Sequence, residues 1–147
     1  MILSGTKIIE EYFLGNIKIT PFDYNSVNPD SYDLSLDDLI YTYDVAVIDS
    51  RNPTPAIQIF IPDEGLVLKK GKYYFAYAKE YVSSDMFVPI LHNKSGVARK
   101  GLFTHITADL QQIYGDGRIL MQLYPIHDIR VFRNQKVIQL SFWCILD

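Results

Sequence analysis

The side chains most often used for metal binding and nucleophilic catalysis are few and scattered in this chain. His92, His105 and His127 occur singly, whereas a metal site needs ligands at close and matched spacing. Cys144, the single cysteine, lies in the apolar run 142–146 and is expected to be a buried, unreactive thiol. The sequence therefore predicts neither a histidine metal site nor a cysteine nucleophile.

Other familiar motifs of catalysis and binding are also missing. The sequence contains no Walker loop, no Gly-x-Ser-x-Gly elbow and no Rossmann fingerprint. The Tyr-rich stretch 73–77 could stack on nucleic-acid bases, but the formal charge of −3 argues against a nucleic-acid partner. The acidic pairs Asp37-Asp38 and Asp63-Glu64 are expected to be solvated turn residues.

Length and composition favour one domain over residues 1–147. Hydrophobic residues make up 48% and charged residues 21%, which suits a sizeable core and excludes wholesale disorder. One cysteine cannot form an internal disulfide. Residues 1–4 lack the regions of a signal peptide, and no apolar run approaches the ~18 residues of a membrane span. We therefore expect neither secretion by a signal peptide nor a membrane partner.

The elements that would position any site begin with a short helix. Ser4 is a plausible N-cap, the apolar residues that follow lie on one helical face, and Gly15 can end the helix. Residues 16–20 alternate as a short strand that ends at Pro21. Residues 25–31 are rich in Asn, Ser, Pro and Asp and are predicted to be a loop.

Beyond residue 31 the pattern is almost entirely that of strands. Short alternating or aromatic runs are separated by turn residues, with room for one more short helix at 94–100. The runs are 32–36, 57–61, 73–81, 86–91, 118–124 and 137–146, and the last is expected to be buried on both faces. Many short strands with frequent turns favour a sandwich or barrel. The predicted class is all-β with a short N-terminal helix.

Several segments, in consistent order along nearly the whole chain, resemble the dCTP deaminase and dUTPase family. The resemblance is carried by the opening residues, by a Ser-Tyr-Asp-Leu-x-Leu strand and by a Gly-Leu-x-x-His-x-Thr-Ala motif, among others; the matching segments are 1–9, 19–22, 28–36, 79–82, 93–99, 101–108 and 134–142. The resemblance implies a dUTPase-like distorted β-barrel or jelly roll that assembles as a homotrimer, with nucleotide sites between subunits. It also implies a magnesium-bound triphosphate and a pyrimidine held by a β-hairpin. In such a trimer, the stretch 73–77 is expected to pack an interface between subunits.

The carboxylates that the family uses for chemistry are replaced in this chain. Residues 107–123 align without gaps to the family hairpin, which puts Gln112 at the position of the dUTPase Asp and Gln122 at that of the deaminase Glu. An amide can orient a water molecule but cannot accept its proton, and losing a general base costs ~10²–10⁴-fold in rate. Asp109 and Asp116 could replace these carboxylates only through a shift in hairpin register.

The family's phosphate-binding segment is partly retained. Ser95 and Arg99 match phosphate-binding positions, Lys94 replaces an Arg, and Gly96 replaces a Ser. Lys keeps the charge but loses the bidentate fork of Arg. The alternative interpretation is that Lys94 and Arg99 are solvated charges beside a turn. The chain also stops at Asp147, where family members continue into a tail that closes over the site.

These departures favour a catalytically degenerate homotrimeric module with a structural or interaction role, such as a viral accessory or decoration protein or a regulator. The alternatives are an active dCTP deaminase or dUTP diphosphatase, and a sensor that binds a pyrimidine deoxynucleotide without turnover. No catalytic residue and no resident cofactor are expected, and Mg²⁺ only where a nucleoside triphosphate is bound. The expected location is cytoplasmic or virion-associated.

Overall fold

A computed structural model describes residues 1–104, 108–111 and 116–147 of the chain. The chain forms ten strands, two α-helices and one 3₁₀ turn within these ranges: α1 (Gly5–Phe13), β1 (Ile17–Thr20), η1 (Tyr24–Ser26), β2 (Tyr32–Thr42), β3 (Ile57–Phe60), β4 (Leu66–Leu68), β5 (Tyr74–Ser84), β6 (Phe87–Asn93), α2 (Ser95–Ala98), β7 (Leu102–Phe103), β8 (Arg118–Pro125), β9 (Ile129–Val131) and β10 (Lys136–Cys144).

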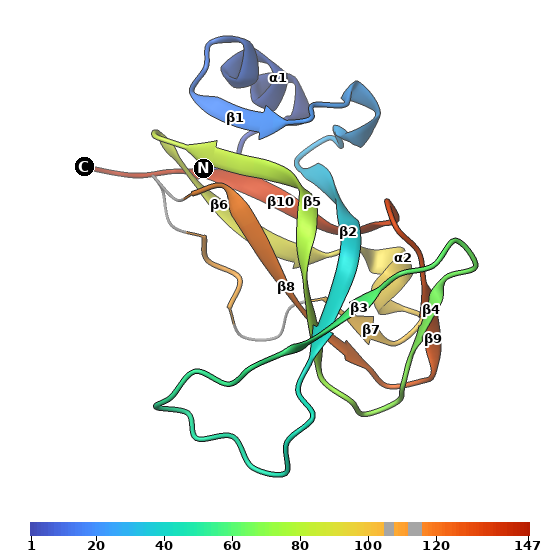
Figure 1. Cartoon of the computed structure of the whole chain (residues 1–147). Coiled ribbons are helices and arrows are strands. Elements are labelled where there is room, and N and C mark those ends of the chain that lie inside the picture. Colours follow the sequence, from blue (N-terminus) through green and yellow to red (C-terminus); the bar gives the residue numbers. More distant parts are fainter. Residues whose placement is uncertain (105–107, 112–115) are drawn as a thin grey trace.

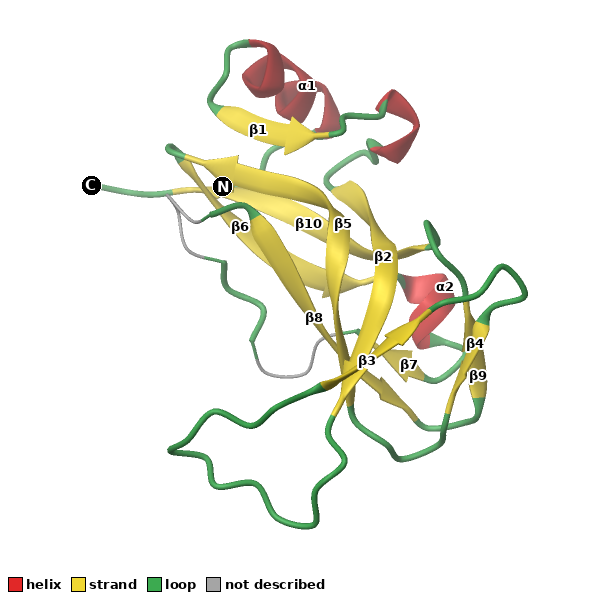
Figure 2. Ribbon diagram, in the orientation of Figure 1, coloured by secondary structure: helices red, strands yellow, loops and turns green. Residues whose placement is uncertain are grey.

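One curved, antiparallel sheet dominates the molecule (Figure 1). Its strands follow the order β6-β10-β2-β5-β8-β7, with β1 added beside β5 and β3 beside β2. Strands β4 and β9 form a separate two-stranded ribbon. Figure 2 shows the helical segments at two ends of the sheet, α1 with η1 at one and α2 at the other. The predicted all-β barrel-like class with a short N-terminal helix is confirmed.

The N-terminal helix forms as the sequence predicts. The Ser4 side chain accepts a hydrogen bond from the Lys7 backbone N–H at 3.2 Å, which caps the first turn. The helix ends where Gly15 adopts a positive φ of 80°, a conformation that glycine adopts without steric cost. Among the described helices, none is long and apolar enough to cross a bilayer.

The core lies on one face of the curved sheet. Alternating residues of β8, namely Ile119, Met121 and Leu123, are at most 3% exposed, and their neighbours 118, 120 and 122 lie on the outer face. Strand β2 contributes Leu34 and Leu36 to the same core. The period of two along each strand therefore decides which side chains reach the outer surface.

One expectation about the strands needs correction. Asp37 and Asp38, predicted to be turn residues, lie inside β2, which continues to Thr42. There the pairing with β5 shifts register between Leu36 and Ile40, so that polar residues are tolerated at the irregularity. Asp63 and Glu64 do lie in an exposed turn, as predicted.

Candidate functional site

The polar residues of segment 94–99 follow directly from the edge strand β6. Lys94 precedes α2, and its carbonyl accepts the backbone N–H of Ala98 at 2.9 Å. Ser95 is the first residue of the helix, and Arg99 follows its last residue with an exposed side chain. This short helix is the element predicted at 94–100.

Lys94 and Ser95 line a polar cleft of ≈300 Å³ together with residues 28–31 and Gln139. The Ser31 hydroxyl donates to Gln139 Oε1 at 2.8 Å, and the Lys94 ammonium contacts Asp33 Oδ2 at 2.6 Å. Arg99 is not among the residues that line this cleft. Two of the three predicted phosphate-binding residues, Lys94 and Ser95, therefore line the same cleft, and Arg99 does not.

Gln122 lies on β8 with its side chain on the outer face of the sheet. Its backbone N–H donates to the carbonyl of Thr104 at 3.1 Å. Its side-chain Oε1 is buried and has no hydrogen-bond partner among the described residues. A buried acceptor without a donor is costly, so a donor from water, from a ligand or from residues outside the described ranges would stabilise this amide oxygen.

Asn93 and Thr104 connect the segment of Lys94 with the strand of Gln122. Asn93 Oδ1 accepts from the Thr104 backbone N–H at 2.6 Å and from its hydroxyl at 2.8 Å. Asn93 Nδ2 in turn donates to the carbonyl of Leu102 at 3.2 Å. Because Thr104 is fully buried, this network holds the segment of Lys94 in a fixed position relative to β8.

Aromatic rings cover the outer face of the sheet next to Gln122. Phe75 is the register partner of Gln122, and its ring stacks on Tyr41 with centroids 5.1 Å apart. We call the group Tyr41, Tyr43, Tyr73, Phe75 and Tyr77 the aromatic face, because each ring lies within 6.5 Å of another member. The Arg118 guanidinium stacks on Tyr77 at 3.8 Å from the ring centroid.

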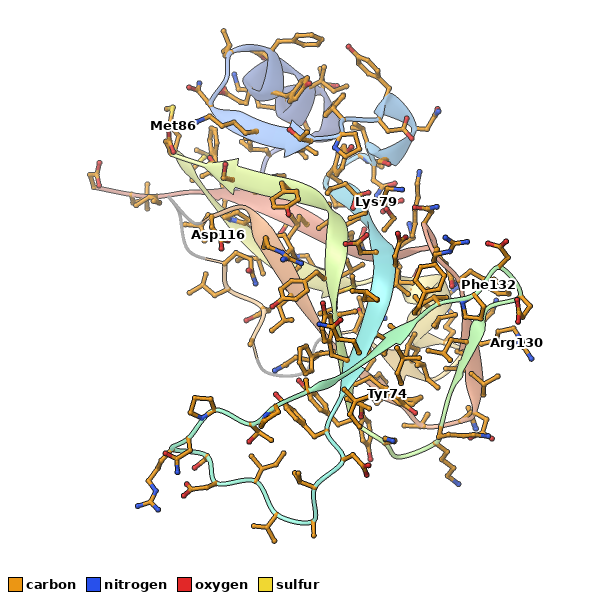
Figure 3. All side chains as sticks on the ribbon, viewed as in Figure 1. Tyr74, Lys79, Met86, Asp116, Arg130 and Phe132 are labelled. Carbon is orange, nitrogen blue, oxygen red and sulfur yellow. The ribbon has the colours of Figure 1, made fainter. Side chains whose placement is uncertain are left out.

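Asp109 and Asp116, the carboxylates considered as replacements, lie in segment 108–111 and just before β8, respectively. Asp116 lines a cavity of ≈250 Å³ with Gly117 and Arg118, and its Oδ1 accepts the Arg118 backbone N–H at 3.0 Å. Figure 3 shows Asp116 far from Arg130 and Phe132, across the sheet. Asp109 is exposed, and its carbonyl accepts from the Leu91 backbone N–H at 2.8 Å.

Two of the residues singled out in the sequence, Gln112 and His105, lie outside the described residues. His92 Nε2 lies 2.6 Å from Ser141 Oγ, and the indole N–H of Trp143 donates to the same hydroxyl oxygen. Within residues 1–104, 108–111 and 116–147, no three His, Cys, Asp or Glu side chains come together as a metal site.

Asp33 and Asn28 are the site residues that sequence reasoning missed. Asn28 Nδ2 donates to Asp33 Oδ1 at 2.7 Å, and Asp33 also accepts from Lys94. Both residues belong to the matching segment 28–36, but a resemblance of segments does not show which side chains meet. Alternation along the strand gave no signal, because the neighbour of the inward-facing Leu34 is expected on the opposite face, whereas Asp33 is buried.

Comparison with known protein families places residues 2–145 in a model described as dCTP deaminase-like. The chain is 36% identical over 142 residues to a dUMP-forming dCTP deaminase of Clostridium beijerinckii, covering 97% of this chain and 82% of that protein. It is also 36% identical over 146 residues to a dUMP-forming dCTP deaminase of Cytophaga hutchinsonii, covering 99% of this chain and 83% of the relative.

The fold has a counterpart among solved structures. A 2'-deoxycytidine 5'-triphosphate deaminase from Agrobacterium tumefaciens superposes with a TM-score of 0.75 at 20% sequence identity. The match covers 96% of this chain and 47% of the other, so the chain spans about half of that protein's length. At this level of identity, the likeness concerns the fold.

Proposed function

Since the chain belongs to the dCTP deaminase-like family, we propose that it binds a pyrimidine deoxynucleoside triphosphate and prefers dCTP to dUTP. The observation that carries the proposal is the buried Oε1 of Gln122, which has no donor among the described residues. The 4-amino group of cytosine is a hydrogen-bond donor, whereas uracil presents an acceptor at the same position. A cytosine next to Gln122 would therefore satisfy this amide oxygen.

The phosphates would be bound at the other part of the site, by Ser95 and the half-buried Lys94 in the cleft and by the exposed Arg99 of the same segment. Ser95 offers a hydroxyl donor, while Lys94 and Arg99 offer charge-assisted donors. Mg²⁺ would enter on the triphosphate as part of the ligand, held by phosphate oxygens.

We further propose that bound dCTP is not deaminated. Deamination at C4 requires a group that takes a proton from water and returns it, and the Gln122 amide cannot accept that proton. The same amide can orient a water molecule or the base itself. The chemistry that remains is recognition, so the chain would sense or sequester the nucleotide.

The second candidate is an active dCTP deaminase, and a specific observation favours it. The relatives at 36% identity are named dUMP-forming dCTP deaminases, and the similarity extends over nearly the whole chain. This candidate needs a general base other than Gln122. Asp116 is the described carboxylate that lines the cavity of ≈250 Å³ beside β8, although its Oδ1 already accepts the Arg118 backbone N–H.

We also propose that the functional unit is a homotrimer whose interface includes the aromatic face. Tyr and Phe are enriched at interfaces between proteins, and Tyr81 and Leu120, at 51% and 40% exposure, extend this outer surface. A second copy against it would cover the aromatic rings beside Gln122. No described residue points to a capsid or another assembly, so nucleotide binding is the function we propose.

The deciding experiment measures binding and turnover separately. Calorimetry with dCTP, dUTP and Mg²⁺ should give tighter binding of dCTP, and the nucleobase should be unchanged after prolonged incubation at high protein concentration. Equal affinities would mean that the Gln122 amide turns to suit either base. Robust release of ammonia would establish the second candidate, and absence of binding to either nucleotide would refute both.

A further inference from the structure

An ion pair lies in the wall of the cleft that contains Ser95. Lys94 Nζ and Asp33 Oδ2 are 2.6 Å apart, within the range of a strong, charge-assisted hydrogen bond. The Asp33 side chain is 6% exposed and that of Lys94 is 28% exposed. Solvent therefore screens this pair less than it screens the surface pairs of the molecule.

The carboxylate of Asp33 is held in place without any ligand. Asn28 Nδ2 donates to its second oxygen at 2.7 Å and also contacts Ser31 Oγ at 3.1 Å. Ser31 is tied to β10 through Gln139, whose Nε2 donates to the carbonyl of Asn93. Both oxygens of Asp33 are thus bonded, and the residues around them are buried or partly buried.

This arrangement determines how an anion can bind in the cleft. Lys94 is the cationic residue among those that line it, and Asp30 adds a carboxylate to the same lining. An ammonium that is already bonded to a buried carboxylate adds little net positive charge. A phosphate entering here must take a donor of Lys94 away from Asp33 or share it.

We propose that Asp33 is an affinity-determining residue: it competes inside the protein with phosphate for the ammonium of Lys94. The inference rests on the proposed binding of a nucleoside triphosphate. Asp33 holds Lys94 along the wall of the cleft and lowers its contribution to phosphate binding. The chain therefore binds triphosphate more weakly than its basic residues would allow.

The substitution Asp33→Asn tests this directly, because it removes the charge and keeps an oxygen for Asn28. It should tighten the binding of inorganic tripolyphosphate and of dCTP about tenfold, and leave any binding of deoxycytidine unchanged. The double variant D33N/K94Q should lose this gain, since the ammonium has been removed. Unchanged or weaker tripolyphosphate binding by Asp33→Asn would overturn the proposal.

Asp30→Asn is the matched control, because Asp30 lines the same cleft and is exposed. It should give less than half of the gain in affinity of Asp33→Asn. An equal gain would mean that the overall charge of the cleft, and not the ion pair, sets the affinity.

Thermal unfolding of each variant reports whether it folds. If Asp33→Asn does not fold, Lys94→Gln in the native background supplies the test: it should weaken tripolyphosphate binding less than twofold, and a tenfold loss would overturn the proposal.

Tripolyphosphate also separates this proposal from the nucleotide-binding proposal. If dCTP binds no better than tripolyphosphate in every variant, base recognition fails while the competition between Asp33 and phosphate stands. If dCTP is preferred but Asp33→Asn has no effect, the proposed function stands and the inference fails.

Discussion

At the scale of single residues, the proposed function depends on the amide that stands at position 122. A carboxylate and an amide have nearly the same shape, but only the carboxylate takes up a proton at neutral pH. In the proposed function, the Gln122 amide therefore contacts the base and does not activate water.

We expect Gln122→Glu to raise dCTP deamination by ~10²-fold or more over the native chain, because it restores a general base. The measurement is the conversion of the nucleobase at saturating dCTP with Mg²⁺. Gln122→Met is the matched control, since it fills the same volume without a proton acceptor and should remain inactive. If Gln122→Glu is as inactive as Gln122→Met while both bind dCTP, more of the site has changed than this residue.

At the scale of elements, helix α1 is joined to the turn that follows it by Glu11. The hydrogen bond from Asn16, at 2.7 Å, and the ammonium of Lys7, at 3.0 Å, lower the pKa of the Glu11 carboxyl below its ordinary value. A carboxyl whose pKa is lowered by folding stabilises the protein above its unfolded pKa. That contribution is lost as the pH falls through the lowered, folded value.

We therefore expect Glu11→Gln to lower the thermal midpoint by about 4 °C at pH 7, with the difference shrinking below ~pH 4. Thermal unfolding followed by circular dichroism over this pH range is the measurement. Glu10→Gln is the control, since Glu10 contacts the same Lys7 but its side chain is 56% exposed. Equal effects of the two substitutions would show that Glu11 has no special role.

Helix α1 also packs closely on the loop that carries Asn28. A Cβ at Gly5 would lie 2.1 Å from the carbonyl oxygen of Asn28, whereas a Cβ at Gly96 meets nothing described within 4 Å. We expect Gly5→Ala to destabilise the fold by on the order of 1–3 kcal/mol. Gly96→Ala should be neutral or stabilise it by up to ~1 kcal/mol. Denaturant unfolding of both variants is the measurement, and a neutral Gly5→Ala would contradict this account of the packing.

The elements themselves were largely predictable from the sequence, because alternation and capping are local. The helix capped by Ser4, the strand ending at Thr20 and the long strands β5, β8 and β10 follow the predicted runs. Strands β4 and β9 are only three residues long, too short for a period of two to be recognised. The pairing of Asp33 with Lys94 joins residues far apart in sequence, so local patterns gave no sign of it.

At the scale of the whole molecule, the aromatic face is the surface that we propose another copy of the chain covers. We expect a homotrimer at micromolar concentration, and Phe75→Asp should dissociate it, because a charge would be placed among stacked rings. Light scattering measures the mass directly. Tyr24→Asp, at an exposed tyrosine of η1, should leave the assembly intact. A native chain that scatters as a monomer would refute the trimer.

The strand order also determines when the sheet can finish folding during synthesis of the chain. Strand β10 lies between β6 and β2, although both of these are translated before it. Until the ribosome has released β10, β2 and β6 each present an unpaired edge to the surrounding cell. Closure of the sheet must therefore follow translation of the last strand, and nascent chains stalled before Lys136 should be bound by chaperones or should aggregate.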